Sequence, residues 1–232
     1  MFSNYFNKRG TFRISLVLIL LIAVFSFNAE EGGAATSTAT DAETLLENFM
    51  HDAKTMRADF TQVVIDEEGR LDESATSSGV FLLQRPGKFR WQVTEPNDQL
   101  LIADGKNLWN YDVELEQATV KAIDASLSAT PAMLLSGEDD VLEAFKVKST
   151  FATIFADLPV QWLELEPVDT HNDFSKIRLG FSNNEIRLIE LATNVGQVIR
   201  IEFSNVTRNL ELDEKLFIFS APDYVDVIGD AS

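Results

Sequence analysis

The side chains in this sequence that could carry out catalysis are few and lie far apart. The two histidines, His51 and His171, stand in unrelated contexts, and the chain contains no cysteine. Glu164 and Glu166 form a spaced pair of carboxylates, but their alternating segment indicates solvent-facing residues rather than a glycosidase pair. The sequence has no nucleophile elbow, zinc-protease motif, phosphate-binding loop or dinucleotide fingerprint. We therefore predict that the protein is not an enzyme and needs neither a metal nor a cofactor.

Residues 84–91 offer a different chemistry, in which an arginine stands beside a proline, a turn and an aromatic strand. The guanidinium of Arg85 carries several N–H donors that could hold several carbonyl oxygens, and a surface salt bridge is its alternative role. Beyond the turn, Phe89 and Trp91 alternate with polar residues and therefore share one apolar face of a strand. Arg90 lies between them, so we expect it to point to the opposite face.

Composition and charge narrow the classes of partner. The chain has 232 residues, of which 45% are hydrophobic, which is enough for one large domain with a real core. A formal net charge of −18 without a basic patch argues against nucleic acid and against docking on an anionic membrane. The 17 phenylalanines are explained most simply by a hydrophobic core, and an apolar binding cavity is the alternative.

The N-terminal residues have the pattern of an export signal. The first 13 residues carry three basic side chains and no acidic one, and residues 14–27 form an apolar run. This run is shorter than the roughly 20 residues of a transmembrane helix. It predicts a signal peptide over residues 1–29, cleaved somewhere in 26–35, with an uncleaved anchor as the alternative. Residues 30–40 are expected to form a flexible lead-in. Because there is no cysteine to receive a lipid, we expect the exported protein to be soluble.

The remaining chain, residues 41–232, is predicted to form one domain. A capping box at residues 40–43 and apolar residues at helical spacing from Ala42 to Met56 predict a first helix. The pattern predicts a short apolar helix over residues 131–137, between a proline and a glycine, and a second helical piece over 140–145. The predicted strands are residues 58–65, 78–84, 88–94, 99–103, 107–113, 117–123, 146–150, 160–166, 175–181, 185–191 and 197–205.

The short turns between these strands allow only antiparallel neighbours. The fold class is therefore mainly β (α+β), with a single curved antiparallel sheet that has one apolar and one solvated face. Such a sheet either closes into a barrel or stays open with helices over its mouth, and the open form creates an apolar cavity. The acidic segment 66–73 lacks the ligand spacing of a calcium loop and is expected to be a solvated hairpin tip.

Several segments together resemble the periplasmic outer-membrane lipoprotein carrier family, LolA. They are residues 58–62, 83–91, 104–112, 116–119 and 130–137, in the family's order and spacing behind a signal sequence. The similarity covers residues 41–140 well, and the C-terminal third is similar only in its strand pattern. The resemblance implies an incomplete antiparallel β-barrel, capped by short helices, whose cavity takes the acyl chains of lipoproteins.

What the resemblance implies for function is a soluble, monomeric chaperone in the periplasm of a Gram-negative bacterium. It would collect acylated lipoproteins from an inner-membrane ABC release complex and deliver them to an outer-membrane receptor lipoprotein. The alternatives are a periplasmic sensor domain of related fold, which binds lipid or a lipoprotein, and a lipid-modifying hydrolase.

The resemblance also implies roles for particular residues. The family's lid-latching arginine falls on Arg85, its cavity aromatic on Phe89 and its lid helix on residues 131–137. The residues predicted to line the acyl-chain cavity are Leu46, Phe49, Met50, Phe60, Phe89, Trp91, Trp109, Met133 and Leu134.

Overall fold

A computed structural model describes residues 39–123, 131–137, 144–168 and 174–231, without the side chains of residues 39–43, 131 and 133. Residues 36–232 form one compact unit. The predicted signal peptide lies outside the described residues, as does most of the predicted helical piece at 140–145. Within the described part of the chain, no helix has the length and apolar character that crossing a membrane requires.

The described strands form one 12-stranded sheet with the order β12-β6-β5-β4-β3-β2-β1-β11-β10-β9-β8-β7. Neighbours pair antiparallel, except that β12 runs parallel to β6. The strands are β1 (Thr55–Ile65), β2 (Leu71–Gln84), β3 (Lys88–Glu95), β4 (Gln99–Asp104), β5 (Asn107–Asp112), β6 (Gln117–Ala122), β7 (Phe145–Phe155), β8 (Leu158–Pro167), β9 (Phe174–Ser182), β10 (Glu185–Thr193), β11 (Val198–Arg208) and β12 (Asp226–Ile228). The predicted single curved antiparallel sheet is confirmed.

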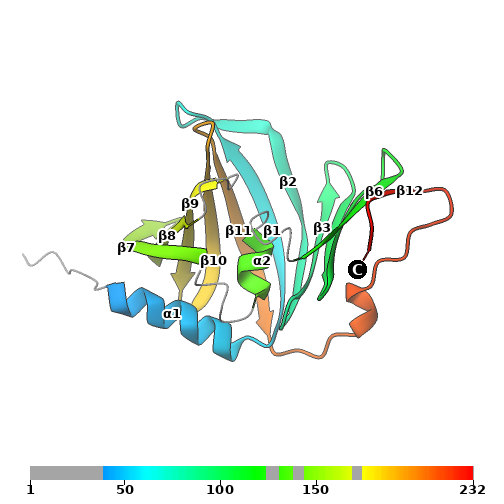
Figure 1. Ribbon diagram of the computed structural model, residues 1–232. Coiled ribbons are helices and arrows are strands. Elements are labelled where there is room, and N and C mark those ends of the chain that lie inside the picture. The colour runs from blue at the N-terminus through cyan, green and yellow to red at the C-terminus, as the bar shows by residue number, and fades with distance from the viewer. Residues whose placement is uncertain (1–38, 124–130, 138–143, 169–173, 232) are drawn as a thin grey trace, which may run out of the picture. The chain divides into compact units, whose positions relative to one another are not determined.

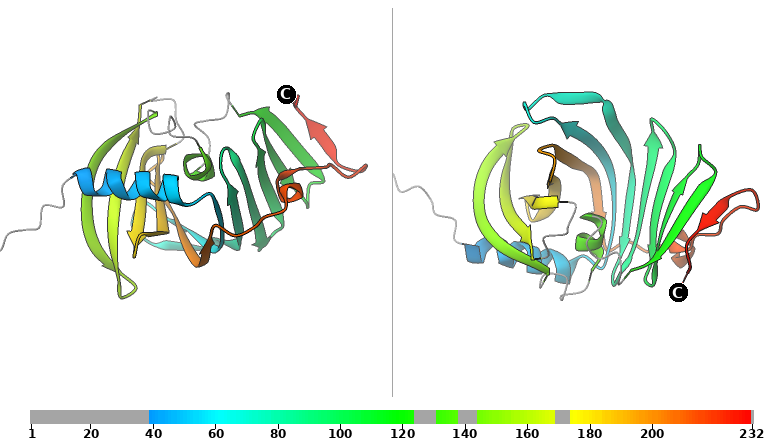
Figure 2. Two further views of the ribbon diagram at one scale, coloured as in Figure 1. Left: turned by 90° about the horizontal axis from the view of Figure 1, so that it is seen from below. Right: turned by 45° about the horizontal axis from the view of Figure 1, so that its top comes forward.

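In the described part of the chain, the helices that accompany the sheet are α1 (Ala39–Asp52), α2 (Pro131–Ser136) and the 3-10 helix η2 (Glu214–Phe217). Figure 1 shows α1 along one end of the curved sheet, and Figure 2 shows α2 on its concave side. The η2 helix lies on the opposite side, in the C-terminal segment that follows β11. The sheet is therefore open, with α1 and α2 where a closed barrel would have further strands.

The differences from the predicted boundaries have physical reasons. The first helix was expected to extend to Met56, but α1 ends at Asp52 and β1 begins at Thr55. Ala53 and Met56 are completely buried on either side of this change, so burial alone did not mark the boundary. The strands β2 and β7 are longer than predicted because pairing with β1 and β8 holds their extra residues in the sheet. These extra residues are largely exposed, so they lack the apolar alternation from which the strands were predicted.

The hydrophobic core lies on the concave side of the sheet. Residues from α1, α2 and nine strands belong to one cluster of buried apolar side chains. Its largest fully buried members are Phe49, Phe81, Phe89, Phe181, Leu46, Met56, Leu83, Leu135, Leu163 and Leu165. Burial of an apolar side chain contributes about 1.5–3 kcal/mol each, so this face supplies most of the stability.

The prediction that one face of the sheet is exposed to solvent is wrong for strands β3 to β6. Ile102 and Val120 point to the convex side, yet they are 1% and 3% exposed. The C-terminal segment covers them, and Phe217 of η2 is itself 1% exposed. Arg90 points to this side as predicted, but it lies beneath the segment and donates from Nη1 to the Leu216 carbonyl at 3.3 Å. Desolvation by burial lowers the pKa of Arg90.

The other half of the convex face carries a row of alternating charges. Glu164 accepts from Arg178 at 2.8 Å and contacts Lys176 at 3.2 Å, while Glu190 contacts Arg178 at 3.5 Å and Arg200 at 2.8 Å. Burial by itself raises the pKa of Glu164, but the hydrogen bonds and charges of Arg178 and Lys176 outweigh it and leave the pKa lowered. The pair Glu164 and Glu166 is thus part of the sheet surface, as the alternation indicated.

We predict that Glu164→Gln destabilises the protein by about 1–3 kcal/mol at pH 7, because charge-assisted hydrogen bonds are lost. A lowered pKa in the folded state contributes stability above the ordinary value of 4.5, and this is lost as pH falls through the folded value. The difference from wild type should therefore shrink below pH 4.5 in urea titrations. Glu166→Gln is the control, because Glu166 is more exposed and pairs with Lys148. A pH-independent difference would contradict the assignment.

Gly79 is required by the close approach of β2 to its neighbour. A Cβ at this position would lie 1.9 Å from the Gln92 carbonyl oxygen and 3.0 Å from Cε1 of Phe60. The register of β2 against β3 shifts between Ser78 and Gly79, which brings the backbones together at this point. The glycine therefore allows the Phe60 ring to lie over the sheet.

We predict that Gly79→Ala destabilises the protein by about 1–3 kcal/mol, since the strands must move apart. Ser78→Ala, one residue earlier, is expected to change stability by less than about 0.5 kcal/mol. Urea unfolding of the two variants and wild type gives the measurement. Equal transition midpoints for the two variants would show that the bulge can relax without cost.

Candidate functional site

Two adjoining cavities open on the concave side of the sheet. The first has a volume of about 380 Å³ and is lined by Gln62, Ser77, Trp91, Val93, Pro96, Asn97, Gln99, Leu101 and Asn110. The second has a volume of about 200 Å³ and is lined by Gln62, Trp91, Leu101, Ala132, Phe174, Leu191, Ile199 and Ile201. Three residues, Gln62, Trp91 and Leu101, line both cavities, so the two cavities adjoin, and we call them together the hollow. Ala132 of α2 borders the smaller cavity.

An aromatic cluster forms the wall next to this hollow. The Trp91 ring lies 4.2 Å from the Phe60 ring, 5.2 Å from Phe81 and 6.2 Å from Phe203, measured between centroids. Phe89 continues the cluster at 6.4 Å from Phe81. These contacts follow from strand register, because Phe81 pairs with Trp91 and Phe60 pairs with Phe203 across neighbouring strands. Such cross-strand aromatic pairs fix a rigid, apolar surface.

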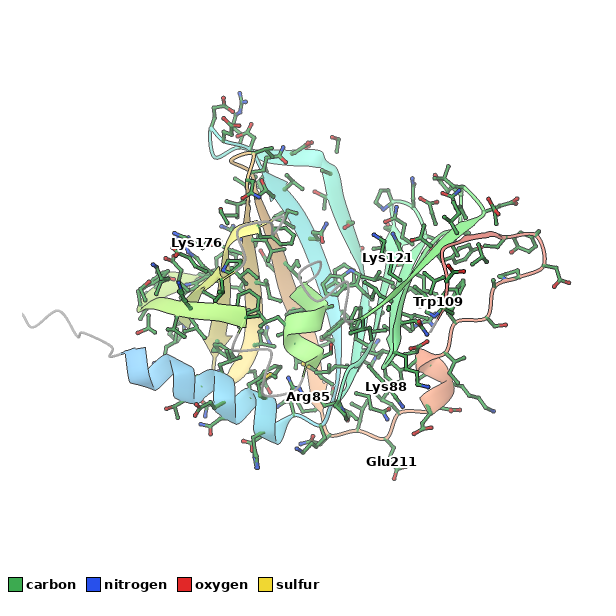
Figure 3. All side chains as sticks on the ribbon, in the orientation of Figure 1. Arg85, Lys88, Trp109, Lys121, Lys176 and Glu211 are labelled. Carbon is green, nitrogen blue, oxygen red and sulfur yellow. The ribbon has the colours of Figure 1, made fainter. Side chains whose placement is uncertain are left out.

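Arg85 lies where α1 and α2 both end (Figure 3). Its Nη1 donates to the main-chain oxygens of Phe49, Met50 and Ala53 at 3.1, 2.9 and 2.8 Å. Its Nε donates to the oxygen of Leu135 in α2 at 3.1 Å, and Nη2 donates to the same oxygen. One guanidinium therefore joins the C-terminal ends of both helices.

This arrangement satisfies groups that a helix cannot satisfy alone. The last carbonyls of a helix lack internal partners and carry partial negative charge, so a cation is favoured there. The guanidinium also lies 4.9 Å from the centroid of the Phe49 ring, and Nη2 contacts Sδ of Met50 at 3.2 Å. The turn after Arg85 adds a main-chain bond from Gly87 N–H to the Ser136 oxygen at 2.8 Å.

The structure brings most of the predicted site residues together. Seven of them belong to the concave core cluster, namely Leu46, Phe49, Met50, Phe60, Phe89, Trp91 and Leu134. Among these, Trp91 faces the open hollow, whereas the others are packed behind it. The side chain of Met133 lies outside the described part of the chain.

The prediction that Trp109 lines the cavity is wrong. Trp109 pairs with Ile102 and Val120, which lie on the convex face, and its ring is 5.1 Å from that of Phe219. Figure 3 shows it on the side of the C-terminal segment, and its Nε1 donates to Asp104 at 3.2 Å. The reason is a change of parity at the β4–β5 turn, where Ala103 pairs with Leu108, so even-numbered residues of β5 face the cavity.

Sequence reasoning missed much of the wall that lines the hollow. Phe174, Leu191, Ile199 and Ile201 come from β9 to β11, where no single motif drew attention. The polar residues Gln62, Ser77, Gln99 and Asn110 were missed because an apolar face was expected. Counting register outward from Phe89 through each hairpin would have found them, since paired residues share a face.

The histidines do not contribute to this site in the described residues. His51 is exposed on α1 and its Nδ1 lies 2.9 Å from Oδ1 of Asp52. His171 lies outside the described residues. In the part of the chain that the structure describes, no three His, Asp or Glu side chains are grouped closely enough to hold a metal ion.

An open, curved sheet with a hollow on its concave side, and with α1 and α2 tied together by Arg85, defines a half-barrel protein whose cavity is mainly apolar beside α2. The family model described as outer membrane lipoprotein carrier protein LolA matches residues 51–220. The chain therefore belongs to the LolA family, and the resemblance seen in its sequence is confirmed.

Relatives and solved structures agree with this assignment. An outer-membrane lipoprotein carrier protein of Methylococcus capsulatus is 38% identical over 219 residues, covering 94% of this chain and 98% of the relative. A protein of the same description from Nitrosospira multiformis is 40% identical over 186 residues, or 80% of this chain and 87% of the relative. The crystal structure of an uncharacterized conserved protein from Thermus thermophilus matches with a TM-score of 0.52 at 11% identity, covering 81% and 98% of the chains. This last likeness shows the fold alone.

We predict that Arg85→Lys loosens α2 while the sheet remains folded, because an ammonium cannot span all of these carbonyl oxygens. Main-chain amides of residues 134–136 should exchange with deuterium at least about tenfold faster, as expected when charge-assisted hydrogen bonds are lost. Arg90→Lys is the matched control, because Arg90 lies on the convex face under η2. Unchanged exchange in α2 of the Arg85 variant would show that apolar packing alone holds this helix.

Proposed function

We propose that this protein carries acylated lipoproteins across the periplasm, with the acyl chains held in the hollow beside α2. The observation that carries the proposal is an apolar cavity on the concave face, walled by Trp91 and Leu101 and bordered by Ala132 of α2. Membership of the LolA family, whose relatives are described as outer-membrane lipoprotein carrier proteins, supports the same function. The protein acts by binding and release rather than by catalysis.

Shielding is the physical task of such a carrier. Acyl chains in water cost about 0.8 kcal/mol for each CH₂ group, so a lipoprotein does not leave a membrane alone. The aromatic wall around Trp91 is preformed, since its rings already contact one another. Binding to it requires little ordering of the protein, which keeps the cost of taking up cargo low.

Release requires that the cover of the cavity can move. Ala132 brings α2 to the edge of the hollow, and Arg85 and Gly87 tie the end of this helix to the β2–β3 turn. We propose that Arg85 acts as the latch and that α2 is the lid. Breaking the bonds to Leu135 and Ser136 removes the polar attachment of α2 without unpairing any strand, so that only its apolar contacts hold it.

The proposed partners follow from the same role. An inner-membrane ABC release complex supplies the acylated lipoprotein, and an outer-membrane receptor lipoprotein accepts it. The carrier works as a monomer in the periplasm of a Gram-negative bacterium. The core residues Leu46, Phe49, Met50, Phe60, Phe89 and Leu134 support the cavity from behind, and Trp91 contacts the chains directly.

We predict that the protein without residues 1–29, incubated with spheroplasts, brings lipoproteins into the soluble fraction in a one-to-one complex. Arg85→Leu should stay folded but lose at least about tenfold in transfer onward to outer-membrane vesicles, because the lid no longer cycles between two states. Gel filtration followed by immunoblotting for a lipoprotein measures both steps. Arg90→Leu serves as the control.

The outcomes separate the alternatives. Absence of lipoprotein from the soluble fraction would overturn the carrier function. Recovery of lipoproteins with cleaved acyl chains would indicate a hydrolase instead. Normal transfer by the Arg85 variant would remove the latch from the mechanism and leave the carrier function standing.

A further inference from the structure

The cavity is not uniformly apolar, because one side of it carries neutral polar side chains. Gln62, Ser77, Gln99 and Asn110 line the larger cavity together with Asn97 of the β3–β4 loop. Strand register places them on the concave face, since Gln62 pairs with Ser77 and with Ile201, and Asn110 pairs with Leu101. We call these five residues the polar ring.

Most of the polar ring is not engaged by the protein itself. Asn97 donates to Glu114 at 3.0 Å, and Gln99 lies 3.5 Å from Asp112, at the limit of a hydrogen bond. Among the described residues, no hydrogen bond joins the side chain of Gln62, Ser77 or Asn110 to another protein group, and Asn110 is exposed to solvent. Amides and hydroxyls donate as well as accept, so this side of the cavity offers both kinds of bond to a ligand.

The lining of both cavities is also uncharged. None of the described lining residues is Asp, Glu, Lys or Arg, although 24% of the chain is charged. A carboxylate or phosphate placed here would gain no opposite charge from the lining, and Asp112 and Glu114 beside Gln99 and Asn97 would repel it. A neutral polar group with carbonyl acceptors and an N–H donor meets no such penalty. The ring therefore favours neutral esters and amides over fatty acids and over the phosphates of phospholipids.

We infer that the polar ring binds the ester and amide groups that join acyl chains to the N-terminal cysteine of a lipoprotein. This inference rests on the proposed function and assigns an orientation to the cargo. The acyl chains extend from Gln62 toward the apolar side formed by Leu191, Ile199 and Ile201. The polypeptide leaves past Pro96 and Asn97, at the end of the cavity formed by the β3–β4 loop.

The ring has a consequence for specificity. Ester carbonyls accept hydrogen bonds that ether oxygens accept poorly, and a side-chain amide that loses water to a bound ligand without gaining a partner is penalised. An acylated N-terminal cysteine should therefore bind more tightly than a hydrocarbon of equal length. The polar ring would thus allow the cavity to bind lipoproteins in preference to other apolar molecules without using a charged side chain.

The test uses three probes with the protein lacking residues 1–29, titrated by calorimetry. They are a cysteinyl lipopeptide with two ester-linked palmitoyl chains, its ether-linked analogue, and palmitate. We expect Gln62→Leu to weaken binding of the ester lipopeptide about three- to tenfold, the loss typical of one or two hydrogen bonds, and to leave the ether analogue unchanged. Wild type should bind palmitate more weakly than the ester lipopeptide.

Two further variants keep the test decisive. Asn110→Leu changes an exposed residue on another strand, and it should give the same selective loss if Gln62→Leu fails to fold. Gln161→Leu, on β8 and outside both cavities, is the matched control and should bind all probes as wild type does. Equal losses for the ester and ether probes, or no loss with either, would overturn the role of the ring. Failure of wild type to bind either lipopeptide would instead overturn the proposed function.

Discussion

The guanidinium of Arg85 donates hydrogen bonds to main-chain oxygens at the ends of two helices, and it ties α2, which borders the cavity, to the end of α1. A helix of six residues such as α2 is far too short to be stable alone, since isolated helices need about 12–15 residues. Its place is therefore set by apolar contacts of Leu134 and Leu135 and by the bonds to Arg85 and Gly87. The hydrogen bonds from Arg85 and Gly87 to the carbonyl oxygens of α2 could be replaced by hydrogen bonds to water or to a partner protein, whereas the apolar contacts could not.

The cavity beside this contact results from the side chains on the concave face of the sheet, which change in character from one strand to the next. Near β1 to β3, large aromatic side chains fill the concave side, and Gly79 gives Phe60 the room it needs. Toward β4 and β5, the same face carries Gln99 and Asn110, so the surface becomes polar where it approaches solvent. The curvature of one sheet thus produces a gradient from an apolar interior to a polar opening.

Features that depend on residues close together in the sequence could be predicted, whereas features that depend on distant residues could not. The alternation of Phe89 and Trp91 and the turn at residues 86–87 predicted strand β3 and its apolar face, because both signals are local. The face of Trp109 could not be read from alternation alone, since it depends on the pairing of Ala103 with Leu108. The cover over Ile102 was equally invisible, because it comes from residues more than a hundred positions away. Arg85 was identified by resemblance, while its carbonyl partners in α1 became evident only in the structure.

The same long-range contacts decide which part of the molecule can move. Strand β3 is packed on both faces near Phe89, which is buried on the concave side, and Ile102 of β4 and Phe217 of η2 are buried on the convex side. Where both sides are packed in this way, the sheet resists deformation, because a displacement would lose close contacts. In contrast, α2 packs on one side of the sheet and is tied at its C-terminal end to a turn. In the proposed function, cargo that enters the hollow displaces α2 rather than the sheet. Opening then works against the apolar contacts of Leu134 and Leu135 as well as the bonds of Arg85 and Gly87.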